Sequence, residues 1–400
     1  MPVDRGDTEK KGTGSVGGGL GRGLGDALSN VQAQQKKAGA PAAAPSRVAE
    51  EATELSERAS ALSSRLSAAR SKATLGDLRG SLGTLDSLLS NLPAAVEEVR
   101  RGGYVYKGFL EKKVEVLREQ WKGLRDRIDK EAAQQGKELS AEADRLQRRI
   151  SALGSRLSAA SLDAVERDIV SLEGKVQGVA SALDKQFETI EQNAQQTDRQ
   201  IKGVKALLER IASATFQLRQ GENAIEMVGA QYLTDGDKDG PKGFLFVTDQ
   251  RLLFEQNEKV ATKKFLFVTT ESERVQKLLI DVPIGSVERA APTERRAFLS
   301  KKEILECTFV KADLSQAVFK LSADSDDWAA LIGRVRTGDI AGEHVGAPAP
   351  TPGEEGAPVP PAAAPAADLP TKCPTCGATL PELMRGQVSL TCEYCGSVVR

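Results

Sequence analysis

Apolar residues recur at alternating steps of three and four along most of the first half of the chain. The first stripes are Val48, Ala52, Leu55, Ala59, Leu62 and Leu66, and then Leu75, Leu78, Leu82, Leu85, Leu89, Leu92, Val96 and Val99. Later stripes begin at Leu110 and Leu162, and the last one continues to Ile211. On an otherwise polar helix, such a stripe is buried only against another helix. We therefore predict a helical coiled-coil stalk over residues 47–216.

Breaks in these stripes divide the stalk into four helices of about 26, 27, 55 and 56 residues. Thr74 with Asp77, and Ser161 with Asp163, have the pattern of helix starts, because hydroxyl side chains cap free amides and acids favour the first turn. The clearest turn is Arg101-Gly102-Gly103.

The stalk also contains an internal repeat. Ser60–Ala69 matches Ser151–Ala160 at nine of ten positions, with an offset of 91 residues. Both copies span a predicted helix break, so we interpret the stalk as a duplicated helical hairpin. A short hairpin would then pack beside the base of a long one, whose outer half would project about 40 Å at ~1.5 Å per residue. The alternative is a chance match, since Ser, Ala, Leu and Arg are common in coiled coils.

Beyond residue 216 the helical period gives way to short β-branched and aromatic segments between turn residues, which are typical of strands. The predicted strands are residues 225–233, 244–248, 251–255, 263–268, 277–284, 303–310 and 316–321. Residues 324–336 then carry one apolar face and predict a closing helix. Together these elements predict a small β-barrel-like domain over residues 217–338.

Three regions have the composition of connecting or terminal segments. Residues 1–46 are rich in Gly and Ala and too weakly apolar to bury a core, which predicts a disordered tail. Residues 339–370 are rich in Pro and Ala and predict a semi-extended linker, with His344 as a solvated residue near its start. That linker would leave the last module, residues 371–400, on a flexible tether.

Composition excludes some classes of function. Lys and Arg (55) balance Asp and Glu (56), for a formal charge of −1, so a general electrostatic grip on nucleic acid is not expected. The N-terminus has no apolar core of a signal peptide, and no run approaches the roughly 18 apolar residues of a membrane span. With two C-x-x-C pairs, the chain is expected in a reducing compartment, which predicts a cytoplasmic location.

Cys373, Cys376, Cys392 and Cys395 form two C-x-x-C pairs separated by fifteen residues. Four thiolates in this spacing suit tetrahedral zinc and predict one structural ion; iron in the same cage and a redox dithiol are the alternatives. Four protein ligands leave no open position for catalysis. The pattern resembles the rubredoxin-like knuckles of the zinc-ribbon family over residues 371–400. Lys372, Arg385, Arg400 and Tyr394 offer only a sparse surface for nucleic acid.

A second motif lies in the predicted barrel. Residues 242–254 read Lys-Gly-Phe-Leu-Phe-Val-Thr-Asp-Gln-Arg-Leu-Leu-Phe, with Gly221-Glu222 before them and Val282-Pro283-Ile284 after them. This resembles the GRAM and bacterial pleckstrin-homology-like (PH-like) families over about 216–338. The resemblance implies a lipid- or protein-binding module with a C-terminal helix. The fold class is therefore multidomain: an all-α antiparallel coiled coil, a PH/GRAM-like β-barrel with its helix, and a small zinc ribbon.

The charged loops of the predicted barrel do not identify a specific partner. The loop 235–240 is acidic, where phosphoinositide-binding relatives are basic, and its EF-hand-like start lacks the twelfth-position Glu, where Phe246 stands. A plain hairpin loop is favoured there. The basic residues expected on other loops are Lys259, Lys263, Lys264, Arg295, Arg296, Lys301 and Lys302. They could meet an anionic membrane surface, although paired surface charges are usually only solvated.

No constellation of residues predicts an enzyme, because the single histidine lies in the linker and Cys307 sits in a predicted strand as a small buried apolar residue. We interpret the chain as a non-catalytic cytoplasmic scaffold or adaptor with no catalytic residues. Protein partners or self-association would use the coiled coil, and the barrel would dock to protein or to a membrane periphery. The alternative is a zinc-ribbon protein associated with nucleic acid.

Overall fold

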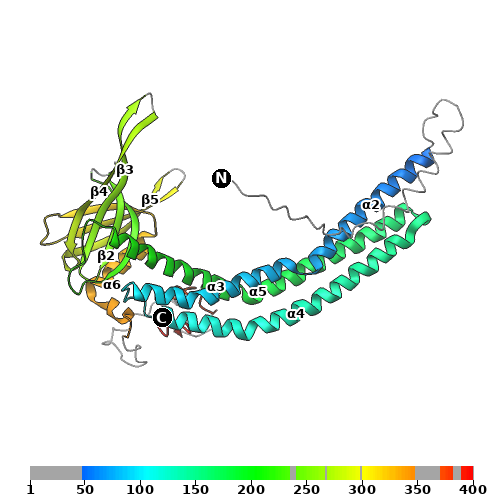
Figure 1. Ribbon diagram of the computed structural model, residues 1–400, viewed down its shortest axis with the longest axis horizontal. Coiled ribbons are helices and arrows are strands. Elements are labelled where there is room, and N and C mark those ends of the chain that lie inside the picture. Colours follow the sequence, from blue (N-terminus) through cyan, green and yellow to red (C-terminus); the bar gives the residue numbers. More distant parts are fainter. Residues whose placement is uncertain are drawn as a thin grey trace, which may run out of the picture.

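A computed structural model describes residues 47–234, 240–265, 268–297, 300–346, 370–381 and 389–399. The predicted disordered tail (1–46), most of the acidic loop (235–239) and most of the predicted linker (347–369) lie outside the described residues. In Figure 1 a long helical bundle carries a β-domain at one end, and the C-terminal cysteine module lies beside the bundle near that end.

The bundle consists of α2 (Arg47–Ala73), α3 (Gly76–Arg101), α4 (Leu110–Leu153) and α5 (Ala159–Ala212). The helix α2 packs on the outer halves of α4 and α5, where Leu66, Leu146 and Ile169 share one core. The helix α3 packs on the inner halves, where Leu85, Leu117 and Leu183 share another. The predicted stripes are therefore buried, in a three-helix cross-section rather than in paired hairpins (Figure 1).

The predicted duplicated hairpin is wrong. Between α2 and α3 the chain makes a kink and does not reverse: Leu75 takes a left-handed conformation (φ 54°) and is itself buried. Both helices bury their stripes on the same two partners, so they follow one another along the bundle and α2 covers the part expected to project. Of the two repeat copies, residues 60–69 lie inside α2, whereas residues 151–160 cover the end of α4, the 3-10 turn η1 (Gly154–Arg156) and the start of α5. The repeat is one of sequence only.

Helix ends follow the predicted turns with local differences. The chain does turn at Gly102-Gly103, where Gly103 has φ 89°. Thr74 caps nothing, because its hydroxyl donates to the carbonyl of Ser71. The cap of α5 is a reciprocal pair of Ser158 with Ser161, three residues before the predicted start. The third helix is shorter than expected, because residues 104–109 form a loop that contacts the β-domain.

The β-domain is one antiparallel sheet of seven strands. The strands are β1 (Ala224–Tyr232), β2 (Lys242–Thr248), β3 (Arg251–Phe265), β4 (Val268–Pro283), β5 (Val287–Ala297), β6 (Ser300–Phe309) and β7 (Gln316–Leu321). Their order is β4-β3-β2-β1-β7-β6-β5, so two meanders meet at β1 and β7. Since β4 and β5 are the two ends of this order, a closed barrel is not formed by the described strands. The closing helix α6 (Ser325–Thr337) packs on β5 and β6.

Two predictions for the β-domain need correction. The segment 263–268, predicted as one strand, is divided between two: residues 263–265 end β3 and Val268 begins β4, with Phe265 opposite Val268. The strand β5 was not predicted, although it contains Arg295 and Arg296, two of the basic residues that were expected on loops. Its charged, Ala- and Pro-containing sequence lacks the apolar alternation that marks a strand.

The loop 104–109 joins the bundle to the β-domain. The Tyr104 hydroxyl donates to the carbonyl of Ile225 (3.0 Å), and Lys107 pairs with Glu226 (2.5 Å). On the far side of the same joint, Glu255 accepts from the amide and hydroxyl of Thr215. Contacts from the α3–α4 loop and from the segment after α5 thus hold the β-domain at one end of the bundle, called here its base.

The start of the predicted linker is folded. Residues Asp339–Glu343 form the 3-10 turn η3, and Val345 donates its amide to the carbonyl of Val105 (2.8 Å). The ring of His344 is exposed, as predicted for a solvated residue, and it meets the ring of Tyr106 edge-on. Within the described part of the chain, no helix is long and apolar enough to cross a membrane.

In the outer half of the bundle, the effect of a substitution on the free energy of unfolding should depend on whether the replaced side chain is buried. Leu172 is fully buried between α2, α4 and α5, while Val170, two residues earlier, is half exposed (50%). Leu172→Ala should lower the free energy of unfolding by about 2–5 kcal/mol, and Val170→Ala by no more than about 0.5 kcal/mol. Urea titration followed by circular dichroism measures both. Equal effects of the two substitutions would contradict the three-helix packing.

Candidate metal centre and buried ion-pair network

The four predicted metal ligands are brought together. Sγ of Cys373 lies 3.6 Å from Sγ of Cys395, and Sγ of Cys376 lies 3.7 Å from Sγ of Cys392. All four sulfur atoms lie within 4.8 Å of one another, and Cys373, Cys376 and Cys392 are buried. A tetrahedral zinc site with Zn–S bonds of about 2.3 Å has sulfur–sulfur edges of about 3.8 Å. The donor set and its spacing therefore fit one tetrahedral ion.

Each C-x-x-C pair forms the same knuckle. The amide of Gly377 donates to the carbonyl of Cys373 (2.7 Å), and the amide of Gly396 donates to that of Cys392 (2.8 Å). Both glycines are left-handed, with φ 68° and 78°, a region that a Cβ disfavours. The short pair β8 (Leu390–Thr391) and β9 (Val398–Val399) closes the second knuckle. Glycine is therefore favoured at the turn of each knuckle.

The first knuckle is docked on the helical bundle, which corrects the prediction of a freely tethered ribbon. The carbonyl of Cys376 accepts from Nζ of Lys113 on α4 (2.9 Å) and from Nε2 of Gln196 and Gln200 on α5 (3.1 and 3.3 Å). Lys113 is fully buried, and its ammonium also contacts Oε1 of Gln196. Burial lowers the pKa of Lys113 to about 8, against the opposing effect of the four cysteines.

Two further contacts extend this interface. The amide of Thr379 donates to Oδ1 of Asn193 on α5 (2.9 Å), and the hydroxyl of Tyr394 donates to Oε1 of Gln120 on α4 (3.1 Å). Tyr394 is only 3% exposed, and burial raises its pKa. Its ring is therefore part of the interface and does not offer the stacking surface predicted from sequence.

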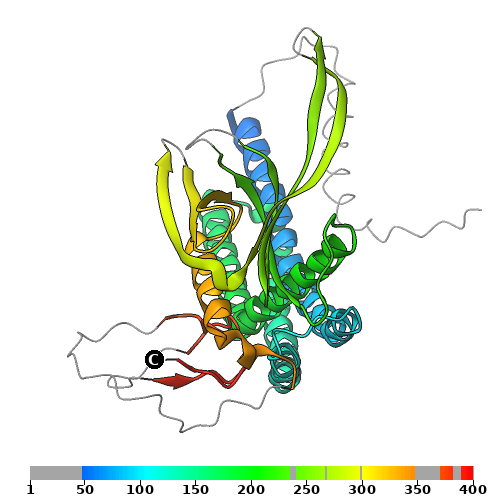
Figure 2. The ribbon, with the colours of Figure 1, turned by 90° about the vertical axis from the view of Figure 1, so that its left-hand side faces the viewer.

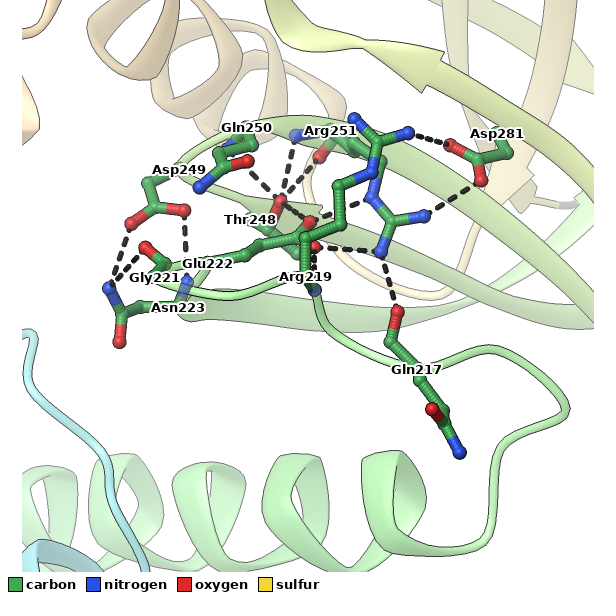
Figure 3. A network of polar contacts seen from close by, with 10 residues as sticks. All are labelled: Gln217, Arg219, Gly221, Glu222, Asn223, Thr248, Asp249, Gln250, Arg251 and Asp281. Atoms are coloured by element: carbon green, nitrogen blue, oxygen red, sulfur yellow. Dashed lines mark hydrogen bonds and ion pairs between the residues drawn. The ribbon is translucent and has the colours of Figure 1, made fainter.

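A second constellation explains the predicted GRAM-like motif. Figure 3 shows the guanidinium of Arg251, at the start of β3, between the carboxylates of Glu222 and Asp281. Both ion pairs measure 2.7 Å, and the side chains of Arg251 and Glu222 are 4% and 0% exposed. Arg251 also donates to the carbonyl of Gln217 (2.8 Å), in the segment that leaves α5.

The remaining motif residues complete this network. Thr248 donates its hydroxyl to Glu222 (2.6 Å) and accepts from the amide of Arg251. Asp249 accepts from the amide and side chain of Asn223 and from the Tyr106 hydroxyl of the bundle. The motif Thr248-Asp249-x-Arg251 thus fastens the start of the β-domain to its second hairpin and to the bundle. Thr248 and Arg251 are buried and Asp249 is half-buried, and all three form hydrogen bonds within this protein.

The electrostatics of the network agree with its geometry. Burial alone would raise the pKa of Glu222, but hydrogen bonds from Arg251, the amide of Arg219 and Thr248 hold it below its usual range. The hydrogen bond to Glu222 raises the pKa of Arg251 further, so both groups are charged at neutral pH. Because every oxygen of Glu222 has a donor, the buried pair is fully satisfied.

The other candidate residues are distributed over the β-domain. Cys307 is fully buried, as predicted, and burial raises its pKa to about 12. The predicted basic loop residues lie on strands β3, β5 and β6 instead. Sequence reasoning missed Lys113 and Gln196, which sit beside the apolar stripes of α4 and α5. The only available signal was the change of the α5 stripe to Ala194 and Thr197, which are close in sequence to the ribbon-contacting residues Asn193, Gln196 and Gln200.

Comparisons with known proteins give little beyond this geometry. No family model matches the chain, and no curated protein matches it. Among solved structures, the chain is similar to the "Vps36 N-terminal PH domain" at 17% identity and TM-score 0.20, over 31% of this chain and 86% of that one. It is similar to the DH/PH domains of p115-RhoGEF at 13% identity and TM-score 0.19, over 52% of this chain and 56% of that one.

A third structure, an N-terminally truncated linker-DH/PH form of p115-RhoGEF, gives 12% identity and TM-score 0.19 over 72% of this chain and 98% of that one. Scores this low carry no argument about this chain. Its own geometry shows a helical N-terminal part, an antiparallel sheet with a closing helix, and a C-terminal four-cysteine cluster. Membership of the zinc-ribbon and GRAM families stays a prediction.

The metal content of the protein should depend on the four clustered cysteines and not on the total number of cysteines. Full-length protein purified without chelator should contain about one zinc ion per chain, because four thiolates form a closed tetrahedral site. Cys392→Ser should lose most of that zinc, while Cys307→Ala, which removes the one cysteine outside the cluster, should keep it. Inductively coupled plasma mass spectrometry provides the ratio. Iron at this ratio would identify the other metal, and an absence of metal with two disulfides would contradict the site.

Removing the Arg251 side chain should reveal the free-energy cost of burying the Glu222 carboxylate without a partner. Arg251→Met should lower the free energy of unfolding by about 3–5 kcal/mol at pH 7, because Glu222 loses its partner. Arg274→Met, at an exposed arginine bound only to Asn257, should change it by less than about 1 kcal/mol. Urea titration of the two variants and the parent compares them.

The contribution of the same network to the free energy of unfolding should depend on pH. Glu222 has a folded-state pKa below its unfolded value, so its contribution is present above about pH 4.3 and is lost as the pH falls through the folded pKa. Arg251→Met should lose this acid-side dependence, whereas Arg274→Met should retain it. An unchanged acid transition in Arg251→Met would contradict the proposed stabilisation.

Proposed function

We propose that the chain is a non-catalytic adaptor that holds a lipid- or protein-binding β-domain at a fixed position on one end of a helical rod. The observation that carries this proposal is the base of the bundle, where loop 104–109 and the end of α5 both contact the β-domain. The rod continues well beyond this base (Figure 1). Two binding surfaces on such a frame are separated and keep their mutual orientation.

The β-domain supports a binding role over a catalytic one. Its most elaborate polar cluster, around Arg251, is buried and internally paired. The polar hollow of about 430 Å³ beside Tyr232 is lined by Asp281, Lys311 and Asp313, with neither a histidine nor a cysteine among its lining residues. The single histidine lies against Tyr106 outside the sheet. None of these groups forms a nucleophile–base pair.

The ribbon supports the adaptor over the nucleic-acid alternative. The carbonyl of Cys376 and the ring of Tyr394 are both engaged by the bundle, so the first knuckle and the single stacking ring face this chain's own helices. A structural zinc ion would then act as a cross-link within the protein, holding the C-terminal residues across α4 and α5. The cytoplasm is the compartment in which such thiolates stay reduced.

The adaptor should contact different molecules at its two ends. A photo-crosslinking amino acid placed at Val170, half exposed on α5, should capture one protein or a second copy of the chain. The same group placed at Glu273, exposed on β4, should capture another protein or lipid. The same group placed at the buried Leu117 gives the background level of adducts. Mass spectrometry identifies the adducts.

Distinct adducts at the two exposed positions, absent at Leu117, would support the adaptor. Adducts at neither exposed position above the Leu117 background would contradict a bridging role. Adducts only at Glu273 would reduce the proposal to a single-surface binding protein. Nucleic-acid adducts at either position would favour the alternative function.

A further inference from the structure

The C-terminal cysteine module contains two knuckles that come from separate pieces of chain. Both views show its described part (red) beside the bundle, at the end that carries the β-domain (Figures 1 and 2). The first knuckle is residues 373–377 and the second is residues 392–396, with one C-x-x-C pair in each. Residues 382–388, between them, lie outside the described residues. A closed four-cysteine site needs these two pieces to meet in one arrangement.

Within the described residues of the module, each backbone-to-backbone hydrogen bond stays on the side of one knuckle. On the first side the amide of Cys373 donates to the carbonyl of Ala378, and on the second the amide of Cys392 donates to that of Ser397. The polar contacts that cross between the two sides are those among the cysteine sulfur atoms and that of the Ser397 hydroxyl with Sγ of Cys373 (3.3 Å). Apart from the cluster and Ser397, hydrogen bonding in this part of the chain does not fix one knuckle against the other.

The helical bundle, by contrast, contacts both knuckles. The carbonyl of Cys376 in the first knuckle accepts from Lys113 on α4 and from Gln196 on α5. The hydroxyl of Tyr394 in the second knuckle donates to Gln120, which is also on α4. Because Lys113 and Gln120 are seven residues apart, they lie on the same face of that helix. One face of α4 therefore holds both knuckles at a fixed separation.

The contacts between module and bundle are buried. Ala378 and Tyr394 belong to the same buried cluster as Leu117 of α4. Lys113 is also fully buried, and one of the two oxygen atoms that its ammonium contacts is the carbonyl oxygen of Cys376. Burying an ammonium is costly unless acceptors surround it, and the docked module supplies one of them. The module is therefore seated in a specific interface.

Holding both knuckles on one helical face lowers the free-energy cost of binding a metal ion. When two half-sites are free, the ion must order them against each other, and the lost entropy reduces its affinity. Groups outside the ligand set that orient the ligand residues raise metal affinity for the same reason. The three hydrogen bonds to the carbonyl of Cys376 act directly on the backbone of a ligand residue.

We propose that the helical bundle is a part of the metal centre, in which Lys113, Gln120 and Gln196 position the two knuckles for the ion. They are positioning residues, since none of them supplies a ligand atom. Metal binding and docking are then coupled: the factor by which docking raises the metal affinity equals the factor by which the metal stabilises docking. Loss of the metal would release the module and uncover Lys113. This inference rests on the structural metal ion of the proposed function.

A self-sufficient zinc module that merely packs on the bundle is the alternative. Its metal affinity would be the same with and without the contacts to α4 and α5. Two observations favour coupling instead. The bundle contacts both knuckles and not only one, and its contacts act inside the C-x-x-C loops, since Cys376 is a ligand residue and Tyr394 lies between Cys392 and Cys395.

The first test measures the zinc affinity of the full-length protein by competition with a chromophoric chelator. Lys113→Met removes the buried ammonium, and Lys112→Met makes the same change at the exposed neighbouring position. Lys113→Met should bind zinc about ten- to hundredfold more weakly than the parent, whereas Lys112→Met should bind as the parent does. Gln120→Ala, which acts on the second knuckle, should also weaken binding. Thermal unfolding followed by circular dichroism confirms that the bundle of each variant is folded.

The second test measures docking without a substitution in the bundle. An amine-reactive ester is applied briefly, and peptide mass spectrometry compares the acylation rate of Lys113 with that of the exposed Lys112. Lys113 should be protected in the zinc-loaded parent. After chelation, or in Cys392→Ser, its rate relative to Lys112 should rise about tenfold or more, because the coupling is reciprocal.

Two results would overturn the coupling alone: equal zinc affinity of Lys113→Met and Lys112→Met, or protection of Lys113 that persists without metal. A parent protein that binds no metal would overturn the coupling together with the metal site itself. The adaptor role is tested independently by the adducts at Val170 and Glu273. The failure of the coupling, of the metal site and of the adaptor role are therefore distinguishable.

Discussion

The loop between α3 and α4 is the constraint on which the arrangement of the protein depends. Arg100 fixes the loop from inside, donating to the carbonyls of Tyr104, Tyr106 and Lys107. The outward groups of the loop then reach β1, the Thr248–Arg251 turn and the segment after α6. At Gly108 a Cβ would lie 3.1 Å from the carbonyl oxygens of Glu343 and His344, so this close approach favours glycine. One short loop thus joins the bundle, the sheet and the C-terminal segment.

The cysteine module adds a second attachment, and its physical basis is electrostatic. A divalent metal held by the four thiolates would leave a net charge of −2, which would be costly to bury next to an apolar bundle. Lys113 places a buried ammonium on the carbonyl of the ligand residue Cys376, and the Gln196 and Gln200 amides add dipoles at the same oxygen. The lysine would otherwise be an unpaired buried cation. Each charge would therefore supply a partner for the other, and this would favour the packing of the C-terminal segment against helices far from it in sequence.

Sequence reasoning succeeded where one local rule decided the outcome. The seam Leu78–Val99 had to be buried, and the two C-x-x-C pairs had to meet, because no other arrangement satisfies those residues. It failed where a single residue set the direction of the chain: Leu75 adopts a left-handed conformation that nothing in its sequence marks, and a predicted hairpin became a continuous rod. The role of Arg251 was hidden for a different reason. The motif residues identify a resemblance, but whether an arginine binds a ligand or a buried glutamate depends on Glu222 and Asp281, which reach it only in the folded sheet. The docking of the ribbon was hidden likewise, since Lys113 looks like an ordinary surface lysine.

Basic residues of the β-domain occur in two opposite charge environments. Arg251 is buried and paired with two carboxylates, so its charge is used within the fold. In the β5–β6 ladder, the backbone register places Arg295 opposite Lys302 and Arg296 opposite Lys301, so positions of like charge are opposed there. In the β3–β4 ladder, the register places Lys263 opposite Glu271, so positions of unlike charge are opposed there. Positions of unlike charge and positions of like charge therefore both stand opposite each other in this sheet, and the like-charge positions weaken the pairing locally.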